Sequence, residues 1–142
     1  YYKIGGKTMG EAESNAYIAG ELGIPVLFAA SDDVCIGQIK DGIPGIRTVV
    51  TKIGKGRNAA EFIAEEKVLE EIYEGVQAAV REPNAPVRLQ YPCGIEVNYT
   101  RPERAEEVLR KVRGYGQDAH YGETTHIVCS VLRGAQDLEA FI

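Results

Sequence analysis

Apolar and polar residues follow one another along this chain with periods that mark short strands and longer helices. Residues 1–4 alternate as a strand does, and Gly5-Gly6 suits the turn of a two-residue hairpin. The unbroken apolar run at 25–30 is typical of a fully buried parallel strand. The elements predicted over the first part are, in order, strand 1–4, strand 7–9, helix 10–22, strand 25–30, helix 34–40, strand 46–51 and helix 58–81.

Several of these elements carry residues suited to their ends. Gly23 stands where a helix commonly ends in the left-handed conformation. Ser31-Asp32-Asp33 follows the apolar strand and suits the cap of helix 34–40. Asn58 is the expected cap of helix 58–81, which has an acidic, solvated outer face. The apolar residues of that helix recur at steps of three and four and are Leu69, Ile72, Val76, Ala79 and Val80.

The second part of the chain continues the alternation of strands and helices. Its predicted elements are strand 87–99, open to interruption at 92–94, helix 102–112, strand 124–132 and helix 135–141. This order indicates an α/β fold in which helices flank a mixed sheet. The length of 142 residues suits a single domain.

Composition and charge exclude several classes of protein. Hydrophobic residues make up 44% and charged residues 26%, as in an ordinary globular protein. The net charge of −5 argues against nucleic acid as a partner. No apolar run approaches the ~20 residues that a membrane span needs. The three widely spaced cysteines form no C-x-x-C pair, which predicts inert, reduced thiols and a cytoplasmic location.

The beginning of the chain is unusual. The only methionine is Met9, and Tyr1 already stands in a strand-like pattern. Because translation starts with methionine, we expect that the front of a larger fold is absent, through processing, proteolysis or the way the chain was prepared.

Helix 10–22 carries the most informative motif. Glu11, Asn15, Ile18 and Leu22 share one helical face, whereas Glu13 lies about 200° around the helix from Glu11. The apolar end of this face, at Ile18 and Leu22, should pack against the core. Glu11 and Asn15, at the N-terminal end of the same face, would then point toward the interior or a cleft. The residues alone allow two interpretations of Glu11: a solvated carboxylate favoured by the helix dipole, or a metal-binding or catalytic carboxylate.

Residues 9–20, Met-Gly-Glu-Ala-Glu-Ser-Asn-Ala-Tyr-Ile-Ala-Gly, resemble the Gly-Glu-x-x-x-Asn-Ala-x-x-Ala-Gly helix of the DppA-type D-aminopeptidases, a family of zinc peptidases. Residues 21–33 resemble the family's small-residue turn, Val-Pro-Val strand and Gly-Asp-Asp. Further along, the family has a Lys, followed by a Gly/Ser-Arg pair and then small residues at a helix start. This series resembles Lys52, Gly56-Arg57 and Ala59-Ala60. Thr124-Thr125 and the closing strand fit its C-terminal end.

The resemblance also has gaps. It covers only the C-terminal half of such a protein, because the family's leading Asp-x-Glu-Gly strand and its zinc-binding histidines have no counterpart here. Ser31 replaces the usual Gly, and the Pro common early in the long helix is absent. These two departures remove no ligand, but they leave the substrate open.

The resemblance implies a specific role for this chain. Glu11 takes the place of the family's last zinc ligand, and Asn15 would fix Glu11 or the substrate by a hydrogen bond. Catalytic zinc needs about three protein ligands, so one Glu is not enough, and no catalytic residue is expected on this chain. A polypeptide carrying the N-terminal half would complete the hydrolase. The family further implies one or two zinc ions, a homo-oligomer such as a decamer, and short peptides or amino-acid amides, including those of D-amino acids, as substrates.

Gly54-Lys55-Gly56-Arg57 forms a glycine loop between a strand and the predicted helix. A plain turn and an anion site are both compatible with it, and in the second case Lys52 or Arg57 would bind a substrate terminus. His120 and His126 stand six residues apart. On one continuous strand they would lie about 20 Å apart, too far to share an ion, and both are expected to be structural or surface residues.

A second hypothesis competes with the enzyme subunit. The chain would then be a non-catalytic assembly or ligand-binding protein that kept the fold and lost the chemistry. Glu11 on a helix face argues mildly against it, and removal of the Glu11 carboxylate distinguishes the two.

Overall fold

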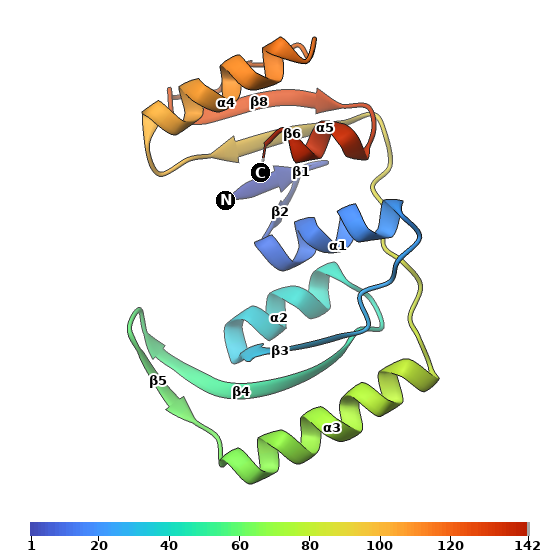
Figure 1. Ribbon diagram of the computed structural model, residues 1–142. Helices are drawn as coiled ribbons and strands as arrows, with labels where there is room; N and C mark the ends of the chain where they lie inside the picture. The colour runs from blue at the N-terminus through green and yellow to red at the C-terminus, as the bar shows by residue number, and fades with distance from the viewer. Residues whose placement is uncertain (142) are drawn as a thin grey trace.

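The computed structural model describes residues 1–141 and confirms the α/β class, with two sheets and flanking helices in the described part (Figure 1). The strands are β1 Tyr2–Ile4, β2 Lys7–Met9, β3 Phe28–Asp32, β4 Arg47–Gly56, β5 Ala59–Phe62, β6 Cys93–Asn98, β7 His120–Tyr121 and β8 Ile127–Leu132. The helices are α1 Glu11–Glu21, α2 Asp33–Gly42, α3 Glu65–Arg81, α4 Pro102–Gly114 and α5 Ala135–Glu139.

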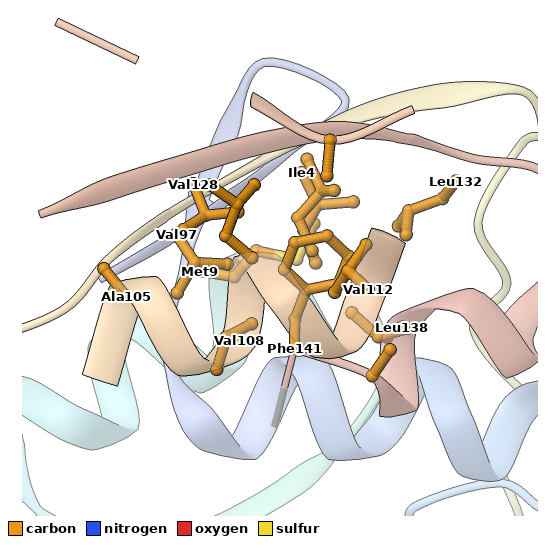
Figure 2. Packing of buried hydrophobic residues seen from close by; sticks show 14 residues of the cluster. Ile4, Met9, Val97, Ala105, Val108, Val112, Val128, Leu132, Leu138 and Phe141 are labelled. Atoms are coloured by element: carbon orange, nitrogen blue, oxygen red, sulfur yellow. The ribbon is translucent and has the colours of Figure 1, made fainter. Parts of the chain in front are cut away.

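The first sheet is antiparallel and has the order β2-β1-β6-β8-β7. Its opening hairpin is the predicted one, because Gly5 and Gly6 have φ of +57° and +82°, which only glycine adopts readily. Helices α4 and α5 cover this sheet, and Figure 2 shows Phe141 lying among Val112, Leu138 and Val108. This apolar core is the larger of two in the described residues.

The second sheet has the order β3-β4-β5 and carries the candidate site. Strand β3 runs parallel to β4, as predicted, whereas β5 returns antiparallel to it. Helix α2 begins where β3 ends, and the Asp32 carboxylate caps it by accepting a hydrogen bond from the Cys35 amide at 2.9 Å. Both α2 and α3 contact the sheet.

Strand β3 is only partly buried, and the prediction of a fully buried strand was wrong. It lies at the edge of its sheet, so that within residues 1–141 only β4 pairs with it. The strand is also displaced along the chain, to 28–32 instead of 25–30. A continuous apolar sequence therefore predicts that a strand forms, but it does not tell how many neighbouring strands and helices bury that strand.

Helix α1 contacts both α2 and α5, but it packs through a different face from the one predicted. Its buried residues are Glu13, Ser14, Ala16 and Gly20. Glu11 and Asn15 are exposed, and Leu22 just beyond the helix is 74% exposed. Small residues explain this choice, because Gly20 lets the helix backbone approach Val87 so closely that a Cβ would lie 1.7 Å from the Val87 carbonyl oxygen.

The region after β4 also differs from the prediction. Residues 59–62 form β5 and not the first turn of a helix, so Asn58 belongs to a hairpin turn and α3 begins at Glu65. Lys52 pairs with Phe62 and Gly54 with Ala60, which holds the hairpin together. In α3, Ala79 is buried as expected, whereas Leu69, Val76 and Val80 are exposed.

The last third of the chain differs from the predicted elements in two places. The strand expected over 87–99 is confined to β6, which begins directly after Pro92. The residues before β8 fold back as β7, in which His120 pairs with Cys129. His120 and His126 therefore do not lie on one continuous strand. No helix in the described part of the chain is long and apolar enough to cross a lipid bilayer.

Candidate functional site

Glu11 is the first residue of α1, and its side chain is exposed. Asn15 follows one turn later on the same exposed side. Of the two positions predicted for these side chains, the interior or a cleft, the interior is wrong for the described residues. They are instead presented outward from the start of the helix, where the positive end of the helix dipole favours a carboxylate.

A buried carboxylate anchors this helix start from the other side. Glu13 is only 4% exposed, and its Oε2 accepts a hydrogen bond of 2.5 Å from the Gly10 amide. The rest of its side chain fills space that a side chain at Gly42 of α2 would occupy, since a Cβ there would lie 2.3 Å from Glu13 Oε1. Ser14 Oγ donates to the Glu11 carbonyl at 3.0 Å. These contacts hold the backbone that carries Glu11.

The described residues do not form a zinc centre by themselves. Across residues 1–141, no group of three or more His, Cys, Asp or Glu side chains lies close enough to hold a metal ion. Catalytic zinc takes about three protein ligands, and Glu11 can supply one of them. The residues present can therefore supply one ligand of such a centre, but not the complete ligand set.

A second feature of the site is a hollow of about 380 Å³ over the β4–β5 hairpin. It brings together Lys52 and Arg57, the two residues predicted to bind a substrate terminus. Asp32, Lys52 and Phe62 are neighbours in register across the three strands, so they form one row across the sheet. The sequence indicates Lys52 and Arg57 but not Phe62, because it predicts a helix over residues 58–81.

The carboxylates near this hollow are already engaged. Asp32 Oδ1 accepts from the Cys35 amide, and Asp33 Oδ1 accepts from the Gly54 amide at 2.8 Å. Lys55 and Glu61, which are not part of the lining, form an ion pair at 3.0 Å. Neither Lys52 nor Arg57 takes part in an ion pair with any residue that the structure describes. Two cations thus remain available to a ligand.

In Figure 1, the beginnings of α1 and α2 and the β4–β5 hairpin all lie toward the left of the view. Glu11 and Asn15 are not among the residues that line the hollow. The described part of the chain therefore contributes two separate polar features, a carboxylate with a neighbouring amide and a cationic hollow.

His126 and the cysteines have structural surroundings. His126 Nδ1 lies 3.2 Å from the Tyr99 carbonyl oxygen, a hydrogen bond that connects β8 with the end of β6. The three cysteines form no disulfide and are partly buried. Burial raises the pKa of the Cys93 and Cys129 thiols. A raised pKa lowers the thiolate fraction and agrees with the predicted inertness of these two residues.

With this geometry in place, comparison with known proteins identifies the family. The sequence model of the family described as D-aminopeptidase matches residues 1–117, and the chain belongs to this family. This confirms the resemblance drawn from residues 9–33.

Two relatives give the extent of the similarity. A D-aminopeptidase of Bacillus subtilis (strain 168) is 31% identical over 67 residues, which cover 47% of this chain and 24% of that protein. The solved structure of the Zn-dependent D-aminopeptidase DppA from Bacillus subtilis, described as a self-compartmentalizing protease, superposes with a TM-score of 0.81 at 22% identity. The match covers 99% of this chain and 50% of DppA, so the chain spans about half the length of that structure.

Proposed function

We propose that residues 1–142 form the C-terminal half of a zinc-dependent aminopeptidase or amide hydrolase that acts on short peptides or amino-acid amides, including those of D-amino acids. The observation that carries this proposal is Glu11. It stands in the family's Gly-Glu motif, at the exposed start of a helix whose backbone is anchored by Glu13 and Ser14. These contacts fix the backbone position from which the Glu11 carboxylate can reach a metal ion.

In this proposal Glu11 is one zinc ligand, and the remaining ligands come from a polypeptide carrying the N-terminal half of the fold. Zinc supplies a Lewis acid and an activated water in hydrolases of this kind. Asn15 orients the Glu11 carboxylate or the substrate, and Lys52 and Arg57 bind the substrate. The reacting histidine or other base would also lie on the N-terminal half.

The surface of the chain supports a partner of this kind. Strand β3 has an edge that no described strand covers, and Ile24 and Leu22 before it are exposed. Open strand edges and exposed apolar side chains are commonly covered by another chain or segment. We further propose that the completed protein is a cytoplasmic homo-oligomer such as a decamer, in line with the description of DppA as self-compartmentalizing.

Hydrolysis by the complete protein tests the proposed function. D-Alanine amide and short peptides with an N-terminal D-alanine should be cleaved, and their L-counterparts should serve to measure the stereochemical preference. A chelator should lower the rate at least ~100-fold, since it removes the group that activates water, and added zinc should restore it. Absence of hydrolysis from zinc-loaded complete protein would contradict the proposal and favour a non-catalytic assembly protein.

A further inference from the structure

We propose that the hollow over the β4–β5 hairpin binds the C-terminal carboxylate of the peptide substrate, and that it thereby makes the protein prefer short peptides with a free C-terminus over their amides. The inference rests on the proposed function, because a peptide carboxylate belongs to the substrate only if the complete protein hydrolyses peptides. It is carried by the juxtaposition of Lys52 and Arg57 in a hollow whose nearby carboxylates are occupied by backbone amides.

The charge in the hollow suits a ligand with a single negative charge. Its lining includes Lys52, Arg57 and Asp32, which leave a net charge of +1. A carboxylate would neutralise this charge, and an Arg guanidinium binds a carboxylate through two parallel hydrogen bonds. Asp32 stands next to Lys52 in register and would oppose a second negative charge on the ligand.

The fold also explains why this position is suited to an anion. Asp32, which caps the beginning of α2, is itself part of the lining of the hollow. The hollow therefore opens beside the beginning of α2, where the helix dipole favours negative charge. The Gly54 amide is already bound to Asp33 Oδ1, which fixes the hairpin on α2 and keeps the hollow in place.

An apolar wall completes the hollow. Phe62 is 78% exposed and lines the hollow together with Ala59 and Ala60. An exposed aromatic side chain next to two cations provides a contact surface for the apolar side chain of the residue that carries the carboxylate. The predicted ligand is thus the last residue of a short peptide, with a free carboxylate and a small or apolar side chain.

Binding can be measured without any catalytic step. N-acetyl-D-alanine and N-acetyl-D-alanine amide have a blocked amine and differ only in the carboxylate. Titrated into the purified full chain and followed by NMR or calorimetry, the acid should bind about tenfold or more tighter than the amide, as a charge-assisted hydrogen bond implies. In the Arg57→Gln variant, the affinity for the acid should fall to the affinity for the amide.

Lys55→Gln is the matched control. Lys55 lies two residues from Arg57 on the same hairpin, pairs with Glu61 and does not line the hollow. The variant removes the same charge and should retain the preference for the acid. Equal affinity of acid and amide for the unmodified protein would overturn the inference, and so would equal losses in Lys55→Gln and Arg57→Gln, since a general field effect would then explain the binding.

Kinetics of the complete protein separate this inference from the proposed function. For a D-alanyl dipeptide, Arg57→Gln should raise KM and change kcat little, because the carboxylate contact is the same in the ground and transition states. The KM of the dipeptide amide should stay unchanged. If neither substrate is cleaved, the proposed function fails while the binding experiment still decides the inference. If both substrates are cleaved and Arg57→Gln changes neither KM, the proposed function stands and only the carboxylate-binding inference fails.

Discussion

Replacing Glu11 with glutamine in the complete protein should lower zinc content and reduce hydrolysis at least ~100-fold, because an amide is a much poorer zinc ligand than a carboxylate. The side chain is exposed at the start of α1 and takes part in none of the contacts that hold the helix. The thermal unfolding midpoint of this chain in the absence of metal should therefore change little. Metal analysis and initial rates measure the two effects.

The matched control for this experiment is Glu65→Gln. Glu65 is also an exposed glutamate in the first turn of a helix, here α3. The substitution makes the same change of charge away from α1 and should leave both zinc content and rate as they are. If Glu11→Gln keeps full zinc and full activity, Glu11 is a solvated helix-end carboxylate and not a ligand.

Gly20→Ala should destabilise the chain by about 3 kcal/mol, the upper part of the range for overpacked interiors. The new Cβ would lie 1.7 Å from the Val87 carbonyl oxygen and 3.3 Å from the Val87 amide nitrogen, so that α1 and the segment before β6 must separate. The contact involves backbone atoms, which cannot be relieved by rotation of a side chain. Urea unfolding followed by circular dichroism measures the loss.

Gly37→Ala provides the comparison for Gly20→Ala. Gly37 also lies within a helix, α2, but a Cβ there would meet nothing within 4 Å. The substitution should leave stability unchanged or raise it by up to about 1 kcal/mol, since Ala favours a helix more than Gly does. Equal effects of the two substitutions would show that the close approach of α1 to Val87 does not hold the fold.

Local signals in the sequence were sufficient for elements whose ends carry special residues. Gly5-Gly6 predicted the first hairpin because its turn needs positive φ, and Asp32 predicted the cap of α2 because its carboxylate reaches the Cys35 amide. The motif at residues 9–20 also indicated the family. Each of these signals depends on a few neighbouring residues and on no distant contact.

The features that depend on distant contacts could not be predicted in the same way. The large apolar residue Leu22 suggested which face of α1 would be buried, but the helix packs through Ala16 and Gly20, whose small size matters only beside Val87. Likewise Ala59-Ala60-Glu61 favours a helix by composition, and its pairing with β4 overrides that preference. The same pairing places Phe62 at the hollow.

Native mass spectrometry of the purified protein, under conditions that retain metal, shows whether a second polypeptide and zinc accompany this chain. Each copy of the 15.5 kDa chain should be accompanied by the half of the fold that carries the other ligands, with mass increments of one or two zinc ions per pair. A chain that remains alone, or a homo-oligomer of this chain without zinc, would contradict this expectation.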